Sequence, residues 1–246
     1  MSLFDLLPAR AAAMAAPAKP EFTIACVLRG GGPYDLGYVK VLALSARRKL
    51  RKPHRFVCLT DAVPWHADWF AAHKIITVPL KHGWPGRWSK MELFRPDLVR
   101  PGLLEGQVFY FDLDTVILRR IDAVARYRGD FAILRDFTRP GEICSAVMSW
   151  RTNAFAYLYD DFAAAADEIM SEFVNEHAWI RHRLNRVGVE PDILQDRFTQ
   201  MFASVTPVPG GPISIEKPKR AGVVCFQGAP KPHQVVDDID WVADHW

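Results

Sequence analysis

Short apolar runs alternate with amphipathic segments along the first third of the chain. Runs rich in β-branched and aromatic residues predict strands over residues 22–28, 54–61 and 74–80. Apolar residues at helical spacing predict a helix over 36–50, whose basic end suits a helix C-terminus, and a short helix over 65–73. Because strands and helices alternate, we expect right-handed crossovers and a mostly parallel sheet.

The middle of the chain adds one helix before the strands resume. Ser89 is the expected N-cap of this helix, Glu92 its capping-box partner, and Pro96 the residue that ends or kinks it. Further strands are predicted over residues 106–118, 130–136, 142–150 and 221–228. Two long helical patterns, over 152–170 and 172–187, separate the last two of these strands.

These elements predict one α/β domain over residues 21–246, with a Rossmann-like mixed sheet, mostly parallel, and flanking helices. A chain of 246 residues can bury one large core of this kind. Residues 1–20, rich in alanine and proline, predict a flexible leader without the order of a secretory signal, which favours a cytoplasmic protein. A second interpretation is a peripheral contact with a membrane or partner by its apolar residues Leu3, Phe4, Leu6 and Leu7.

Composition and charge exclude several classes of function. The net charge of +3 suits a phosphate-bearing ligand. No basic run is interleaved with aromatic residues, so we expect no nucleic-acid partner. No apolar run approaches the roughly 18 residues of a membrane-spanning helix. The cysteines occur singly within apolar stretches, which predicts buried free thiols at Cys26, Cys58, Cys144 and Cys225.

The stretch VFYFDLDTVIL places two carboxylates at the end of an apolar run. In an extended strand alternate side chains share a face, so Asp112 and Asp114 should point the same way and Leu113 should point back. Two like charges this close repel each other unless a positive group lies between them. Because ligands bind at the carboxyl edge of open α/β sheets, we prefer a ligand site to a solvated strand end.

One family with this string is the haloacid-dehalogenase-type phosphatases, whose D-x-D-x-[TV] motif also follows an apolar strand. In that interpretation Asp112 is the nucleophile and Asp114 the acid/base. Those enzymes usually carry the motif on their first strand. Here a complete strand–helix–strand–helix–strand section comes first, which argues against a phosphatase.

The order of features resembles the GT-A glycosyltransferases, in particular the lipopolysaccharide glycosyltransferase and glycogenin group and related bacterial enzymes. Their D-x-D follows an N-terminal nucleotide-binding half, and their late Gly-x-x-Lys-Pro signature is matched by residues 228–232. The resemblance runs from about Phe22 to the C-terminus and includes WSKMELF, residues 88–94. It implies metal-dependent transfer of a sugar from a nucleotide donor, a UDP-sugar, to a glycan, lipid-linked or protein acceptor.

The resemblance also implies a Mn²⁺ or Mg²⁺ ion held by Asp112 and Asp114, with Asp112 contacting the ribose as well. Lys231 would pair with a phosphate as a point charge. Relatives supply a histidine as third metal ligand, where this chain has Cys225 or Gln227. Because a hard cation prefers oxygen to sulfur, we expect the Gln227 amide to serve, with His233 as the alternative.

The nucleotide is expected to lie against the Gly-rich turn after the first strand, at Arg29, Gly30 and Tyr34. Asp61, at the end of the second strand, is expected to hydrogen-bond the base or ribose. By the resemblance, Lys90 would reach the sugar-nucleotide from a helix start. A solvated first-turn lysine is an equal interpretation of Lys90.

In relatives a Gly-Asp-Gln segment touches the donor sugar and the acceptor. Glu176 and His177 occupy the comparable place here and are the expected catalytic residues. Because both differ from the family pattern, a second hypothesis is a degenerate relative that binds a nucleotide or scaffolds a partner without turnover.

Overall fold

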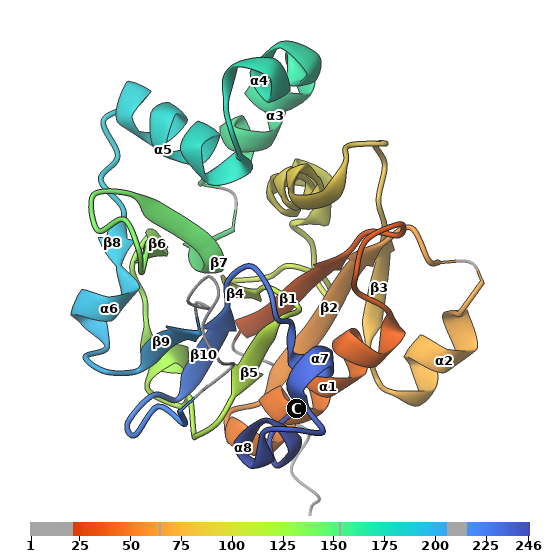
Figure 1. Ribbon diagram of the computed structural model, residues 1–246. Helices are drawn as coiled ribbons and strands as arrows, with labels where there is room; N and C mark the ends of the chain where they lie inside the picture. Colours follow the sequence, from red (N-terminus) through yellow and green to blue (C-terminus); the bar gives the residue numbers. More distant parts are fainter. Residues whose placement is uncertain (1–21, 64, 153, 206–215) are drawn as a thin grey trace, which may run out of the picture.

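The computed structural model describes residues 22–63, 65–152, 154–205 and 216–246. In these ranges the strands form two sheets (Figure 1). The larger sheet contains β1 (Phe22–Leu28), β2 (His54–Thr60), β3 (Ile76–Pro79), β4 (Gln107–Phe111), β6 (Phe131–Arg135), β7 (Ile143–Arg151) and β8 (Asp192–Ile193). The smaller sheet contains β5 (Thr115–Ile117), β9 (Phe202–Val205) and β10 (Val223–Phe226).

The strand order of the larger sheet is β3-β2-β1-β4-β7-β6-β8. β7 pairs antiparallel with β4 and β6, and the other pairs of this sheet are parallel. The smaller sheet, in the order β5-β10-β9, has one antiparallel and one parallel pair. The predicted mixed and mostly parallel sheet is therefore confirmed.

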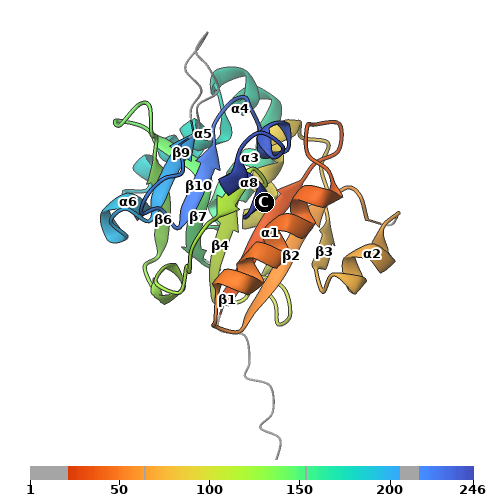
Figure 2. The ribbon, with the colours of Figure 1, turned by 60° about the horizontal axis from the view of Figure 1, so that its bottom comes forward.

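Helices cover both faces of the larger sheet. The α-helices are α1 (Leu36–Lys49), α2 (Ala67–Ala72), α3 (Ala156–Ala164), α4 (Ala166–Glu172), α5 (Glu176–Arg186), α6 (Leu194–Arg197), α7 (Pro232–Val235) and α8 (Asp240–Ala243). The 3-10 helices are η1 (Gly86–Phe94), η2 (Pro96–Leu98) and η3 (Val124–Arg126). Figure 2 shows α1 lying across β1 and β2. On the opposite face η1, α3 and α5 pack against the sheet, which confirms the predicted flanking helices.

β1 is apolar except at Thr23 and is buried on both faces. Ile24, Cys26 and Leu28 pack into the core that contains α1. Ala25 and Val27 pack into the core that contains η1 and α3. A strand covered on both sides produces a continuous apolar run, which is the pattern of a buried parallel strand. The parallel pairing of β1 with β4 then places their carboxyl ends side by side.

The strand predicted over residues 106–118 is two strands in different sheets. β4 ends at Phe111 and β5 begins at Thr115. Between them the Thr115 N–H donates to the Asp112 carbonyl oxygen (3.1 Å), which closes a turn. The buried Leu113 continues the apolar pattern through this turn, so the pattern alone does not show it.

Other element boundaries also differ from the prediction. The segment predicted as a helix from Ser89 is η1, which begins earlier; the Ser89 hydroxyl donates to the Gly86 carbonyl oxygen (2.7 Å) instead of capping a new helix. The pattern over 152–170 is divided at Ala165 into α3 and α4, and α5 begins only at Glu176. No sequence pattern predicts β8, α6, β9, α7 or α8. Each has at most 4 residues, too few to show a period.

The four cysteines are buried free thiols, as predicted. The leader interpretation, including the contact by its apolar residues, concerns residues 1–20, which lie outside the described residues. Among the helices of the described ranges, none combines the length and the apolar character that a bilayer crossing requires.

Candidate active site

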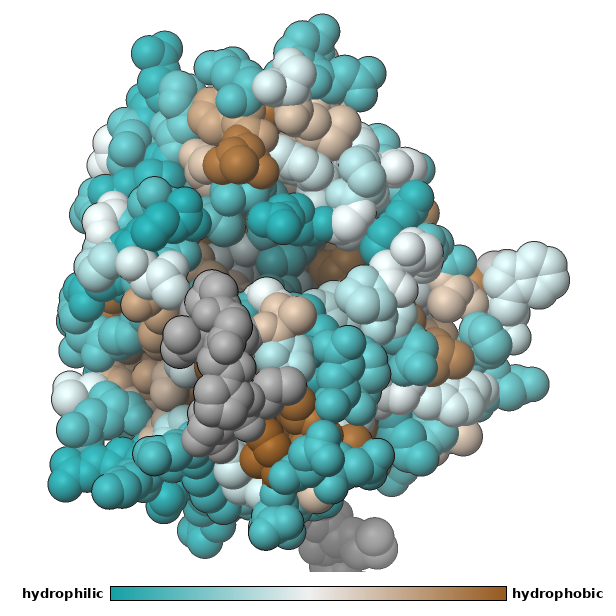
Figure 3. Space-filling model, in the orientation of Figure 1, coloured by the Kyte–Doolittle hydropathy of each residue, from teal (hydrophilic) through white to brown (hydrophobic). Residues whose placement is uncertain are grey.

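A large pocket opens at the carboxyl ends of the central strands. It has a volume of about 1200 Å³ and is lined by the β1–α1 turn, η1, the β4–β5 turn, β7, the start of α5 and the segment after β10. Figure 3 shows the hollow near the middle of one face, bordered by hydrophilic residues. This edge of an open α/β sheet is where ligands bind.

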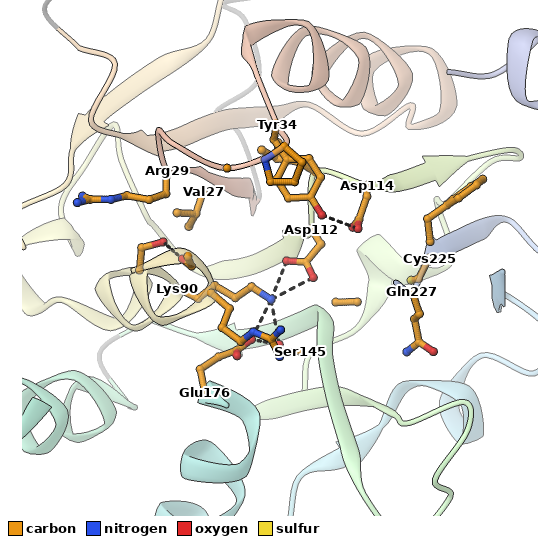
Figure 4. Close-up of a pocket in the computed structure, with 18 of the residues that line it drawn as sticks. Val27, Arg29, Tyr34, Lys90, Asp112, Asp114, Ser145, Glu176, Cys225 and Gln227 are labelled. Atoms are coloured by element: carbon orange, nitrogen blue, oxygen red, sulfur yellow. Dashed lines mark hydrogen bonds and ion pairs between the residues drawn. The ribbon is translucent and has the colours of Figure 1, made fainter. Parts of the chain in front are cut away.

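The β4–β5 turn presents two carboxylates to this pocket. Asp112 and Asp114 both line it, and Figure 4 shows them on neighbouring parts of its wall. The turn between the strands brings them together, so the expectation that an extended strand aligns them is wrong. Leu113, between them, is 2% exposed and belongs to the core that contains α1.

Lys90 of η1 neutralises Asp112. Its Nζ lies 2.8 Å from Oδ1 and 3.0 Å from Oδ2 of that carboxylate. The same ammonium lies 2.9 Å from Glu176 Oε1 and 3.1 Å from Ser145 Oγ, so all three of its protons have acceptors. Burial lowers the pKa of Lys90, but the charges of Asp112 and Glu176 outweigh it and raise the pKa above its usual value. Lys90 is therefore a buried, charged group and not a solvated helix-start lysine.

Asp112 has a second donor in the hydroxyl of Tyr110. Burial raises the pKa of Asp112 against the opposing charge of Lys90, and the nearby charge of Asp114 raises it further. The carboxylate thus depends on Lys90 to remain ionised in this part of the pocket.

Glu176 is a buried anion at the start of α5. It is 1% exposed, and its Oε1 accepts from Lys90 and from the Ser145 hydroxyl (2.5 Å). Burial raises the pKa of Glu176, but the charge of Lys90 and the hydrogen bonds from Ser145 and Lys90 outweigh burial and lower it below its usual range. Its other oxygen, Oε2, is buried and accepts no hydrogen bond from the residues described. Because a buried oxygen of a charged group is costly to leave without a donor, this atom indicates a place for a ligand's donor.

His177 lies beside Glu176 and also lines the pocket. Its Nδ1 is 4.0 Å from Glu176 Oε1, and its Nε2 is buried without a partner in the described part of the chain. Burial lowers the pKa of His177, so its imidazole is neutral near pH 7. The two expected catalytic residues therefore each bring one unpartnered polar atom to the same region.

Asp114 is neutralised from the other side of the pocket. Lys231, which follows β10, places its Nζ 2.5 Å from Asp114 Oδ2, and the Tyr34 hydroxyl donates to the same oxygen (2.7 Å; Figure 4). Burial raises the pKa of Tyr34, and the charge of Asp114 raises it further, so Tyr34 remains a hydrogen-bond donor. The Gly-rich turn and the C-terminal segment thus meet at one carboxylate.

Asp61 contacts the Gly-rich turn, and its contact with a base or ribose stays a prediction. Its Oδ1 and Oδ2 accept from the Gly30 N–H at 2.9 Å and 3.2 Å, and Arg29 Nε lies 3.4 Å from Oδ2. Arg29 and Gly30 line the pocket, whereas Asp61 is not among its lining residues. Asp61 therefore stabilises the Gly-rich turn from outside the pocket lining.

Glu92 positions η1, and with it Lys90, in a way that capping-box reasoning did not reveal. Its carboxylate is completely buried and accepts from the backbone N–H groups of Lys81 (2.7 Å) and His82 (3.0 Å). Arg95, 2% exposed, adds a hydrogen bond of 2.6 Å from Nη1. A glutamate and an arginine three residues apart at the end of an apolar helical stretch were the only signal available in the sequence.

We expect Glu92→Gln to lower the free energy of unfolding by about 3 kcal/mol, because breaking a buried ion pair leaves the charge of Arg95 with weaker compensation. Urea unfolding followed by circular dichroism would measure the change. The matched control is Glu190→Gln, which removes an exposed partner of Arg181 and should cost less than about 1 kcal/mol. Equal losses in the two variants would show that Glu92 has no special structural role.

The pocket offers oxygen ligands for a divalent cation. Asp112, Asp114 and the side-chain amide of Gln227 line it, and oxygen donors suit Mg²⁺ or Mn²⁺. Within the described ranges, no cluster of three or more His, Cys, Asp or Glu side chains could bind a metal ion by itself. The residues present therefore fit a cation only if ligand oxygens and water complete its coordination.

The two alternative ligands fit less well. Burial raises the pKa of Cys225 well above its usual value, which keeps this residue a neutral thiol. His233 is hydrogen-bonded through Nδ1 to the Tyr38 hydroxyl and is not among the lining residues. The Gln227 side-chain nitrogen lies 3.5 Å from Cys144 Sγ, which holds the amide on the pocket wall.

No model of a known protein family matches the sequence, and no curated protein is similar to it. The fold, in contrast, matches solved structures. The glycosyltransferase GlyE of Streptococcus pneumoniae TIGR4 matches with a TM-score of 0.53 and 10% identity over 74% of this chain, and its apo form with 0.55 and 11% over 86%. The apo structure of WbbM, a bifunctional glycosyltransferase, matches with 0.57 and 11% over 94% of this chain.

This chain spans about half the length of these structures, between 47% and 56% of each. At such low identity the likeness concerns the fold alone. It agrees with the mixed sheet and the flanking helices described above. The chain has a GT-A-like glycosyltransferase fold.

Proposed function

We propose that this protein transfers a sugar from a nucleotide donor, a UDP-sugar, with the help of a divalent cation. The observation that carries the proposal is the buried, ionised Glu176, whose Oε2 lacks a donor in the described part of the chain, beside the lysine-neutralised carboxylates of the β4–β5 turn. Sugars bring hydroxyl donors and a nucleoside diphosphate brings anionic oxygens. The unpartnered acceptors of the pocket suit the sugar hydroxyls, and its lysines suit the anionic oxygens of the diphosphate.

In this proposal each end of the pocket serves one part of the donor. Arg29, Gly30 and Tyr34 lie where the β1–α1 turn can hold the nucleoside. Lys231 supplies positive charge for the diphosphate that departs from the sugar. Glu176 Oε2 and His177 Nε2 accept hydrogen bonds from hydroxyl groups of the donor sugar or of the sugar acceptor, since both atoms are unpartnered among the described groups.

Asp112, Asp114 and Gln227 would hold the cation, which as a Lewis acid would stabilise the charge on the departing diphosphate. Asp112 is also placed to contact the ribose. The donor fills only part of a pocket of about 1200 Å³, and the remaining space suits an acceptor glycan, lipid-linked sugar or protein side chain.

We expect UDP to raise the thermal stability of the protein in the presence of Mn²⁺ and to do so much less without it. A ligand that binds only the folded state at about 100 times its Kd adds about 2.7 kcal/mol to the free energy of unfolding. Differential scanning fluorimetry with UDP and Mn²⁺, separately and together, measures the effect, and a UDP-release assay with a panel of UDP-sugars then tests turnover.

Inorganic phosphate and an aryl phosphate serve as controls in the same experiment. Binding of UDP without release from any donor would favour the scaffold hypothesis over an enzyme. Mg²⁺-dependent hydrolysis of the aryl phosphate, without UDP binding, would favour the phosphatase and overturn the proposal.

A further inference from the structure

The turn carboxylates of the pocket are already neutralised by protein groups. Each accepts from one lysine and one tyrosine, Asp112 from Lys90 and Tyr110 and Asp114 from Lys231 and Tyr34. A divalent cation at this turn must therefore compete with an ammonium group for at least one carboxylate. The two lysines are not equivalent in this competition.

Lys90 is locked in place. Its ammonium has three acceptors, Asp112, Glu176 and Ser145, and the residue is 9% exposed. Moving it would leave Glu176, which is 1% exposed, as an unpaired buried anion. Such a loss is among the most costly changes a folded protein can make, so Lys90 stays with Asp112.

Lys231 is held far less firmly. Its ammonium bonds Asp114 Oδ2 at 2.5 Å and the Phe226 carbonyl oxygen at 3.2 Å, which leaves its third proton without a protein acceptor among the described residues. Its side chain is 18% exposed and lines the pocket. A flexible four-carbon stem can swing this ammonium to another anion within the same pocket.

We propose that Lys231 is an exchangeable counter-ion of Asp114. It neutralises this carboxylate before ligands bind, gives it up to the divalent cation, and then pairs with the diphosphate of the donor. This inference rests on the proposed function for its second partner, the diphosphate, but its first step concerns the metal alone. Because Asp112 remains paired with Lys90, Asp114 is the principal metal ligand of the turn.

The exchange links metal binding to nucleotide binding. Without a nucleotide, metal must displace the ammonium from Asp114 and leave it unpaired in the pocket, so metal alone binds weakly. With a nucleotide present, the displaced ammonium gains a phosphate, so the two ligands strengthen each other by the same factor. Part of this coupling should therefore pass through Lys231 in addition to any direct contact between metal and phosphate.

The test measures Mn²⁺ binding by titration calorimetry and by the electron paramagnetic resonance signal of free Mn²⁺, without nucleotide. Lys231→Met should bind Mn²⁺ alone about tenfold more tightly than the wild type, since one charge-assisted bond no longer competes. With saturating Mn²⁺ it should bind UDP about tenfold more weakly, since the phosphate loses the ammonium. The mutual strengthening of Mn²⁺ and UDP should fall accordingly.

Lys231→Arg keeps the charge and should retain weak Mn²⁺ binding in the absence of UDP. Lys217→Met, at an exposed lysine 3.1 Å from His245, should change neither affinity. Thermal unfolding confirms that each variant is folded. If Lys231→Met binds Mn²⁺ alone no more tightly than the wild type, or if neither protein binds Mn²⁺, the exchange is overturned. If the Mn²⁺ difference appears but no protein binds UDP, the first step stands and the proposed donor fails.

Discussion

Asp114→Asn is expected to reduce sugar transfer and UDP release by at least about 100-fold, in the range found when one group that stabilises charge in a transition state is removed. The amide keeps the size of the side chain and can still accept from the Tyr34 hydroxyl. It cannot neutralise Lys231 or bind a divalent cation as a carboxylate does. The variant should therefore remain folded while Mn²⁺-dependent UDP binding is lost in calorimetry.

Asp122→Asn is the matched control for this change. Asp122 pairs with Arg120 and the backbone N–H of Arg51, and it does not line the pocket. Its variant should retain donor binding and turnover. Unchanged Mn²⁺-dependent UDP binding in Asp114→Asn would contradict both the metal role of Asp114 and the function proposed for the pocket.

The sequence predicts those parts of the fold whose residues are buried on both sides. β1, β2 and β4 appear as apolar runs because helices cover both faces of the sheet, and the alternation with α1 and α2 predicts their parallel pairing. The turn after β4 was not predictable, because Leu113 is as buried in the turn as it would be in a strand. Very short elements such as α7 and α8 have no readable period and are held by the packing of Val235 and Trp241 onto the smaller sheet.

In the candidate site, too, local sequence patterns were predictive and contacts between distant residues were not. Asp112 and Asp114 were found from spacing alone, since two acids at the tip of an apolar run are conspicuous. The contact of Lys90 with Glu176 could not be predicted from the sequence. It joins residues 86 positions apart, which the packing of α5 against η1 brings together. Without that contact, Lys90 was equally well explained as a solvated lysine.

The predicted position of Glu176 came from resemblance, but its charge state comes from burial and pairing. The position of Asp61 at the end of β2 predicts a contact with the nucleotide, and its carboxylate accepts from the Gly30 N–H in the fold. A motif thus locates a side chain near a site, and its hydrogen-bond partners in the fold show which contacts a ligand must displace.

Lys90→Met is expected to lower the free energy of unfolding by about 3–5 kcal/mol, the usual cost of removing one partner of a buried ion pair. Asp112 and Glu176 would remain as neighbouring buried carboxylates without a cation. The same variant should lose UDP release. Urea unfolding measures the first effect, and the control Lys81→Met, at a half-exposed pair with Asp97, should change stability by less than about 1 kcal/mol.

The double variant Lys90→Met/Glu176→Gln separates stability from function. Neutralising Glu176 as well should recover part of the lost stability, because only Asp112 then remains as a carboxylate without its cation. Turnover should not recover, since Glu176 Oε2 would no longer be a charged acceptor for the sugar. If the double variant is no more stable than Lys90→Met, the two charges are not coupled. If it regains turnover, Glu176 serves only to hold Lys90 and takes no part in binding the donor.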